Sequence, residues 1–413
     1  MTTIKRFKNL ILNRALRTIA IILFIRIGTF LPVPGINHTD LAFYTQTNSV
    51  VKLLTNTFSG NDTFIIGLFF LNIFPHINAS VLIQLLIGIF PKLAKLQKEG
   101  SFEGRRKIST LTRLLTLIFA IIQSTGLALQ LKQILFNWNW LLAFEIVSWL
   151  TAGAMIVFWC SDIITEYCLG NGISILIYVN IISNLPNLTQ NLFFGVDGDF
   201  QILITLIIFM SLYGIVFLTQ GVRNIPLISS KQLNQTTFKN SWEIDSYLPL
   251  RFNQAGVMPI ILTTSILVVP NYLSNLNLLP KIGLPIDFEY FQFLYWIIHF
   301  MLIVIFSSFY AWIVLNPKDI SDEFQKMSIA IPGIRPGIQT TFYLQQVMTR
   351  ITTIGAIILA TLVTLPNFLA SQLNINSLSG LSASSLLIVT GVLLDLRREV
   401  KNLYYATIYN EIY

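Results

Sequence analysis

The chain has 413 residues, of which 54% are hydrophobic and 11% are charged, and its formal charge at pH 7 is +8. Because soluble globular domains carry about 25% charged residues, this composition excludes an ordinary soluble protein. It indicates a polytopic helical membrane protein, whose length accommodates roughly ten spans with their loops.

Ten apolar segments are predicted to cross the membrane as helices. A basic amphipathic segment, 1–17, precedes them, and a polar tail, 397–413, follows them. In chain order the predicted spans are 18–36, the interrupted stretch 58–91, 111–131, 141–163, 172–187, 200–220, 255–273, 291–315, 351–370 and 381–396.

Positive charge is divided very unequally between the two sides of this ten-span arrangement. Of the 27 Lys and Arg residues, 23 fall on the side of the N-terminus and three on the other side, and Arg26 lies inside the first span. Loops on the cytoplasmic side of a membrane carry such an excess. We therefore expect both termini and the two long polar loops, 221–254 and 316–350, to face the cytoplasm or its equivalent.

The second span, 58–91, is interrupted near its middle. Pro75 removes a backbone donor there, and Asn72, His76 and Asn78 add polar groups. Irregular backbone at membrane depth is tolerated only against protein or a water-filled cavity. The stretch is therefore predicted to form two half-helices that meet at the centre of the protein, at a pore.

Residue patterns for catalysis or metal binding are not found in the sequence. None of the three histidines has a metal-ligand partner at helical spacing, and no glycine-rich phosphate loop occurs. Cys160 and Cys168 suit two reduced thiols better than a disulfide. No enzyme activity, metal or cofactor is expected.

Acidic residues are scarce in the predicted spans, and this distinguishes two function classes. A secondary transporter of small solutes also uses broken helices at the midplane, but a coupled one usually shows buried carboxylates along its path. Their scarcity favours a passive channel, and the transporter is kept as the alternative. Arg26 is either functional or simply paired with backbone carbonyls.

Two aliphatic pairs at helical i,i+4 spacing follow the interruption and recur in the fifth span. They are Ile77 with Val81 and Ile177 with Ile181. Such faces usually meet lipid or a neighbouring helix, but they can also form an apolar constriction. In the second long loop, the turn IPGIRPG (331–337) presents Arg335 on a rigid mount, which suggests a docking contact.

Nine blocks, in this order within the ten-span frame, resemble SecY, the family of channel subunits of the Sec protein translocase. The blocks are LPVPGIN (31–37), INASVLIQLL (77–86), KEGSFEGRRKISTLTR (98–113), GNGISI (170–175), NQAGVMP (253–259), NPKDISD (316–322), IPGIRPG (331–337), LQQVMTRIT (344–352) and SSLLIVTGVLLD (384–395).

The resemblance implies an all-α clamshell fold of ten transmembrane helices. Its two five-helix halves, 18–190 and 191–396, would be related by an inverted pseudo-two-fold axis. It also implies a passive channel that conducts unfolded polypeptides. Helices would leave sideways into lipid through a lateral gate between the second and third spans and the seventh and eighth.

The resemblance further assigns residues to a plug, a pore ring and a docking surface. The plug, at about 59–72, includes Ser59, Gly60, Phe64, Ile65, Ile66, Gly67 and Leu68. The ring comprises Ile77, Val81, Ile177, Ile181, Ile261 and Ile388. The docking cations are Arg223, Lys231, Arg251, Lys318 and Arg335.

The partners implied are small membrane subunits like SecE and SecG, the motor ATPase SecA, with the ribosome as an alternative, unfolded preproteins and membrane lipids, with no direct nucleic acid contact. The first long loop is less basic than in many relatives, which favours SecA over the ribosome. The bias towards Ile, Asn, Phe, Leu and Lys is similar to plastid-encoded SecY of algae. This implies a thylakoid location with both termini in the stroma; a bacterial plasma membrane is the alternative.

Overall fold

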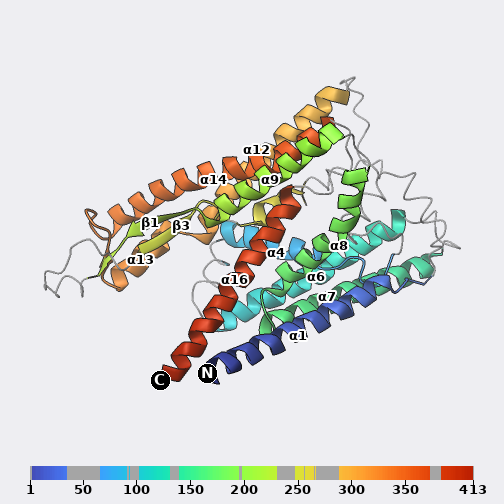
Figure 1. Cartoon of the computed structure of the whole chain (residues 1–413). Coiled ribbons are helices and arrows are strands. Elements are labelled where there is room, and N and C mark those ends of the chain that lie inside the picture. Colours follow the sequence, from blue (N-terminus) through green and yellow to red (C-terminus); the bar gives the residue numbers. More distant parts are fainter. Residues whose placement is uncertain are drawn as a thin grey trace. The chain divides into compact units, whose positions relative to one another are not determined.

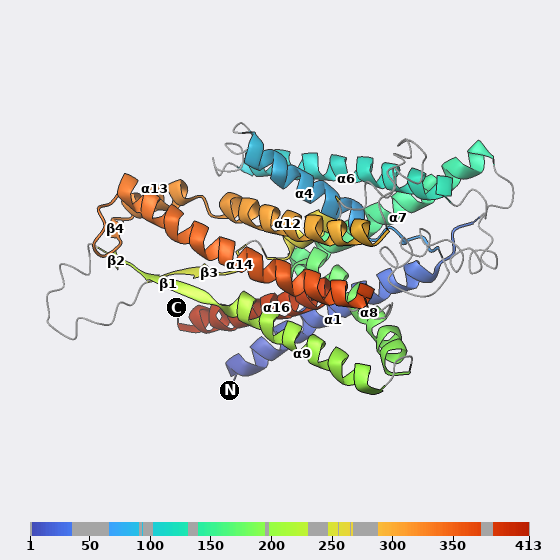
Figure 2. The same ribbon diagram turned by 90° about the horizontal axis from the view of Figure 1, so that it is seen from above.

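A computed structural model gives the fold of the chain in two compact units (Figures 1 and 2). Unit 1 comprises Met1–Gly195 and Gly391–Tyr413, and unit 2 comprises Val196–Thr390. The residues that the structure describes are 2–34, 66–90, 93, 102–130, 139–194, 198–229, 247–254, 256–264, 266, 288–372 and 383–412.

Unit 1 is helical in its described residues. Its helices are α1 (Thr2–Phe30), α4 (Phe74–Ile89), α6 (Phe102–Gln130), α7 (Trp140–Tyr167) and α8 (Gly172–Phe194). Helix α6 packs against both α4 and α7, and α7 also packs against α1 and α8. Both chain ends lie at the same end of this unit in Figures 1 and 2, in agreement with an even number of spans.

Unit 2 is built around α9 (Gly198–Gln220), α12 (Phe288–Val314) and α14 (Ile338–Gln372), with the start of α16 (Ala383–Ile412). Helix α14 packs against α9 and, more extensively, against α12. A buried aliphatic cluster joins these helices. It contains Ile215, Leu218, Ile260, Ile303, Leu359, Ala360, Val363 and Leu387.

The two long polar loops of unit 2 are folded together. Strand β1 (Val222–Pro226) pairs antiparallel with β3 (Tyr247–Arg251), and β2 (Ile228–Ser229) pairs with β4 (Ile329–Ala330) of the other loop. Helix α13 (Pro317–Lys326) packs against α14. A second buried cluster lies beneath them, formed by Ile225, Leu227, Leu250, Ile331, Leu344, Val347, Met348 and Ile351. These loops therefore form a small structured layer.

Several elements are longer than their predicted spans. Residues 2–17 continue into the first span as one helix, α1, and that helix ends at Phe30, before the two prolines of LPVPGIN. Helix α14 has 35 residues, so it is about 52 Å long, against about 30 Å for the hydrocarbon core of a bilayer. Its first turns therefore extend well outside the membrane.

The described helices have the composition of membrane spans. Four of them are long and apolar enough to cross a bilayer: Arg106–Leu129, Trp140–Tyr167, Leu294–Lys326 and Ile338–Pro366. Three shorter apolar helices occur at Phe74–Ile89, Gly172–Ser183 and Thr205–Gln220.

Candidate pore segments and docking surface

The interruption of the second span is a run of turns followed by a fresh helix. Residues 68–73 form turns, in which the Phe70 amide bonds to the Gly67 carbonyl at 3.1 Å and the Asn72 amide to the Phe69 carbonyl at 2.9 Å. Helix α4 then begins at Phe74 with Pro75 in its first turn, where the missing amide is harmless. The prediction that a half-helix continues to Asn72 is therefore wrong for 68–72. Asn72 instead has a positive φ of 47°, which takes it out of the helical path.

Backbone hydrogen bonds tie this run of turns to the end of α1. The amide of Val33 donates to the Ile66 carbonyl at 3.1 Å, and the amide of Leu68 donates to the Leu31 carbonyl at 2.9 Å. Between them, Pro32 and Gly67 form an antiparallel bridge. A short strand-like pairing thus holds residues 66–68 in place.

Close packing reinforces that pairing. A side chain at Gly67 would place its Cβ 2.0 Å from the carbonyl oxygen of Thr29, so only glycine fits this approach. Ile66, Phe69 and Leu71 are almost completely buried. Of the predicted plug, Ile66, Gly67 and Leu68 are therefore bonded and packed. The remaining plug residues, Ser59, Gly60, Phe64 and Ile65, lie outside the described residues.

His76 connects the first turn of α4 to two neighbouring helices. Its Nδ1 lies 3.1 Å from Oγ1 of Thr116 on α6, and its ring lies 4.4 Å from the ring of Phe158 on α7. The Thr116 hydroxyl donates its own hydrogen to the Thr112 carbonyl at 2.7 Å. It can therefore only accept from His76, which requires the tautomer protonated at Nδ1. His76 thus links α4 to both α6 and α7.

Four of the six predicted ring residues belong to unit 1. Ile77 and Val81 lie on the first turns of α4 and are buried, at 4% and 6% exposure. Ile177 and Ile181 lie on successive turns of α8 and are half-buried. The structure therefore gives each pair the shared helical face that its spacing predicts.

The other two ring residues belong to unit 2, and both are half-buried. Ile261 lies in the short helix that begins at Met258, where its amide bonds to the Val257 carbonyl at 3.3 Å. Ile388 lies in the first turns of α16. Since the six residues are divided between the two units, their assembly into one ring stays a prediction.

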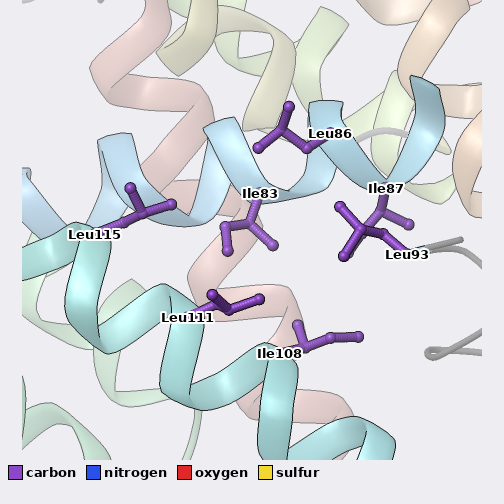
Figure 3. Close-up of a pocket in the computed structure, with 7 residues that line it drawn as sticks. All are labelled: Ile83, Leu86, Ile87, Leu93, Ile108, Leu111 and Leu115. Carbon is purple, nitrogen blue, oxygen red and sulfur yellow. The ribbon is translucent and has the colours of Figure 1, made fainter. Parts of the chain in front are cut away.

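A small apolar pocket lies between α4 and α6 (Figure 3). Its volume is about 80 Å³, and its lining is entirely aliphatic: Ile83, Leu86 and Ile87 from α4, Ile108, Leu111 and Leu115 from α6, and Leu93. Figure 3 shows Ile83 and Ile87 of α4 facing Ile108 and Leu111 of α6 across it. A lining without polar groups offers nothing for acid, base or metal chemistry.

The turn that carries Arg335 is held rigidly, as its sequence predicts. The Ile334 amide donates to the Ile331 carbonyl at 3.1 Å, and Oγ of Ser321 on α13 donates to the Gly337 carbonyl at 3.0 Å. Oγ1 of Thr340 donates to the carbonyl of Arg335 itself at 2.9 Å. The Arg335 side chain is exposed. The structure thus fixes its backbone from both α13 and α14.

The other predicted docking cations are spread over several elements. Arg223 on β1 is opposite Leu250, and Arg251 on β3 is opposite Val222, so the two arginines emerge on opposite faces of the ribbon. Lys318 lies exposed in the first turn of α13. Lys231 lies outside the described residues. Of the docking cations that the structure describes, Lys318 lies on α13, the helix whose Ser321 bonds to the turn that carries Arg335.

Two exposed apolar side chains beside Arg335 were not singled out by the sequence. Ile338 is 89% exposed and Phe342, one helical turn later, is 70% exposed. Exposed polar residues, including Gln345, Gln346 and Thr349, follow them before the next exposed apolar side chain, Ile354. The pair thus lies beyond a polar band, on the aqueous end of the long helix α14. The sequence carried no signal for this pair, because Ile and Phe are ordinary residues in a helix and only the tertiary structure shows that they are exposed.

Metal-binding clusters are absent from the described part of the chain: no group of three or more His, Cys, Asp or Glu side chains converges there. The candidate site therefore consists of two parts, the apolar segments around α4 and α8 and the basic, partly apolar corner around Arg335.

A family model described as SecY matches residues 67–397 of the chain. The chain belongs to the SecY family. The protein translocase subunit SecY of Trieres chinensis is 53% identical over 98% of both chains, and that of Guillardia theta is 40% identical over 100% of this chain and 99% of its own. The SecY family match thus extends over practically the whole sequence.

Solved structures match the SecY fold of the chain over the same extent. A structure described as that of a protein conducting channel has a TM-score of 0.67 at 17% identity and covers 96% of this chain and 93% of its own. Sec61 in the canine ribosome–channel complex has a TM-score of 0.63 at 15% identity, with coverages of 96% and 93%. These matches confirm the predicted all-α, ten-helix membrane fold.

Proposed function

We propose that the chain is the pore-forming subunit of a Sec translocase, which conducts unfolded polypeptides across the membrane and releases hydrophobic helices sideways into lipid. One observation carries this proposal: the chain matches protein translocase subunits SecY over nearly its whole length. The channel is passive and no enzyme, so the energy comes from partners. The direct test is reconstitution of the chain with its small co-purifying subunits in liposomes. Export of a preprotein only when a motor ATPase and ATP are added would support it.

The apolar seal of this channel is proposed to consist of Ile77, Val81, Ile177, Ile181, Ile261 and Ile388. A narrow neck lined by aliphatic groups resists ion flow because hydrating it is unfavourable. Replacing Ile77, Ile177 and Ile261 together by Gly should raise ion leak through the resting channel in liposomes. Unchanged leak together with unchanged translocation would remove these residues from the ring.

We propose that the movable part of the plug ends at residue 65, and that residues 66–68 stay in place when the channel opens. This limit rests on the hydrogen bonds and close packing that hold residues 66–68 against α1. A solved structure with a TM-score of 0.66 is described as showing that the plug domain of its SecY stabilises the closed channel. Deletion of residues 59–65 should raise resting leak, whereas the protein should keep its thermal stability. Wild-type leak in that deletion would argue against a plug here.

The docking surface for the motor is proposed to be the corner of Arg335 and Lys318 with Ile338 and Phe342. The apolar pair favours a protein partner over RNA, because phosphates are bound by charge rather than by aliphatic contact. Arg335→Glu should abolish motor-driven export while the protein still inserts. Replacing Ile338 and Phe342 by Asn should weaken motor binding. The loss of affinity should be the same at low and at high salt, because salt screens charges and not apolar contacts. Gln345→Ala, on the exposed polar band, serves as the control.

The protein is an integral membrane protein, and we infer that it belongs to a plastid, with both termini and the docking surface in the stroma. The algal relatives and the excess of Lys and Arg on one side support this. The thylakoid is the proposed membrane. Protease added to intact thylakoids should cut within the predicted long loop 221–254 if that loop faces the stroma. Protection of that loop until the membrane is opened would reverse the orientation.

A further inference from the structure

The arginine inside the first span has a defined partner in a distant helix. Nη2 of Arg26 on α1 donates a hydrogen bond to the carbonyl oxygen of Val179 on α8 at 2.8 Å, across 153 positions of sequence. The Arg26 side chain is partly buried. The guanidinium therefore joins two helices of unit 1.

The partner is a backbone carbonyl, and no described carboxylate forms an ion pair with Arg26. The two ion pairs found between described residues are Arg113–Asp162 and Arg398–Asp395. A charge within a span is costly unless it faces protein and finds acceptors. A helical carbonyl has a second lone pair beyond its intrahelical bond, so Val179 can accept from Arg26 without breaking α8. The charge is thus tolerated only while α8 stays within its reach.

The bond meets α8 at the turn that carries two predicted ring residues. Val179 is two positions from Ile177 and two from Ile181. At 100° per residue, Ile177 and Ile181 share one side of the helix and Val179 lies on the other. Arg26 therefore binds α8 on the side opposite the face that bears the two isoleucines. A shift of α8 by one residue would move that face by 1.5 Å and turn it by 100°.

Helix α1 is itself fixed two residues further on. The Phe69 amide donates to the Gly28 carbonyl at 3.4 Å, and the Phe69 ring fills the space above Gly28. Phe69 belongs to the turns that lead directly into α4, with Ile77 and Val81. One continuous set of contacts thus runs from the start of α4, through α1, to the middle of α8.

We propose that Arg26 is a positioning residue for the apolar seal: by holding the Val179 carbonyl, it sets the height and rotation of Ile177 and Ile181 relative to Ile77 and Val81. This inference rests on the proposed ring, and it concerns the resting channel. Loss of the bond should let α8 shift and leave the seal incomplete, without removing any side chain from the ring.

The test compares four variants of the channel, purified with its small co-purifying subunits and reconstituted in liposomes. Arg26→Leu removes the donor and the charge, and Arg26→Lys keeps the charge and one donor group. Arg17→Leu removes the same charge from an exposed position on the same helix, and Ile177→Gly tests the ring directly. Resting ion leak and export of a preprotein without a functional signal sequence are measured for each.

We expect Arg26→Leu to raise resting leak roughly tenfold, the shift that loss of one charge-assisted hydrogen bond produces in a two-state equilibrium. It should also permit export without a signal sequence. Arg26→Lys should restore most of the seal, and Arg17→Leu should match the wild type. The melting temperature of Arg26→Leu in detergent should not fall, because the substitution removes a partly buried charge together with its hydrogen bond. A leaky variant that melts normally indicates positioning rather than misfolding.

Three outcomes would overturn the inference. Wild-type leak in Arg26→Leu while Ile177→Gly leaks would leave the ring intact and exclude Arg26 from positioning it. Equal leak in Arg26→Leu and Arg17→Leu would show a general charge effect. If Arg26→Leu does not accumulate in the membrane, Arg26→Lys decides. An Arg26→Lys channel that leaks fully and melts at a lower temperature than the wild type would show that Arg26 has only a structural role. Normal leak in Ile177→Gly as well as in Arg26→Leu would instead count against the ring itself.

Discussion

The carbonyl oxygen of Leu68 occupies the place where a side chain on Gly153 would begin. A Cβ built on Gly153 in α7 would lie 2.0 Å from that oxygen, and the Phe69 ring lies 3.3 Å from the same point. Helix α7 thus closes over the turns that precede α4 from one side, while α1 bonds to them from another. The irregular backbone at the centre of the second span is covered by protein, as its depth requires.

Gly153→Ala should therefore destabilise the protein. The added methyl group meets a backbone oxygen that cannot rotate away, and overpacking of this kind typically costs about 1–3 kcal/mol. The free energy of unfolding in detergent, or the melting temperature, measures the effect. Gly126→Ala is the matched control, because Gly126 in α6 has open space within 4 Å of its Cβ position. That variant should be neutral or stabilised by up to about 1 kcal/mol. Equal stability of the two variants would contradict the close approach.

Asn72 should tolerate glycine better than a branched side chain. Its φ of 47° lies in the left-handed region, which suits Gly, then Asn, and excludes β-branched residues. It is buried, and its Oδ1 finds no partner among the described residues. We expect Asn72→Gly to keep wild-type thermal stability and Asn72→Val to lower it markedly. A Val variant as stable as the Gly variant would show that the turn adopts another conformation.

The bond between His76 and Thr116 should give a clear double-mutant cycle. Thr116→Val leaves the buried imidazole N–H without its acceptor, which costs about 1–3 kcal/mol. Combining it with His76→Phe removes both polar groups, so most of that loss should be recovered. Unfolding free energies of the two single variants and the double variant measure the coupling. Strictly additive effects would mean that the two side chains do not interact.

Cys160 and Cys168 should resist thiol reagents in the folded protein. Both are free and buried, each about 4% exposed. Burial raises the pKa of the Cys168 thiol, although Arg17 and Arg14 oppose the shift. Because the thiolate is the reactive form, labelling of Cys168 should still increase with pH above about 8.5, where an ordinary thiol levels off. A maleimide reagent should modify neither residue at pH 7 within minutes and both after denaturation in SDS. Rapid labelling of the native protein would contradict their burial.

Much of the architecture was accessible from local sequence properties. The low charge, the apolar segments and the placement of Lys and Arg predicted a helical membrane protein, and the described helices lie within a few residues of the expected spans at Trp140–Tyr167 and Phe288–Val314. The prediction was less accurate where a helix continues through a polar stretch. Helix α14 begins at Ile338, inside the expected loop, because packing of Leu344, Val347 and Met348 stabilises its first turns.

The sequence by itself determined the class, the spans and the family, because hydrophobicity, helical spacing and motif order are carried by residues close together in the chain. Tertiary structure decided what the broken span is, which carbonyl Arg26 holds and which apolar side chains stay exposed beside Arg335. Each of these depends on atoms from segments far apart, such as Leu68 with Gly153 or Arg26 with Val179. The sequence alone does not show which backbone oxygen a given glycine or arginine will contact.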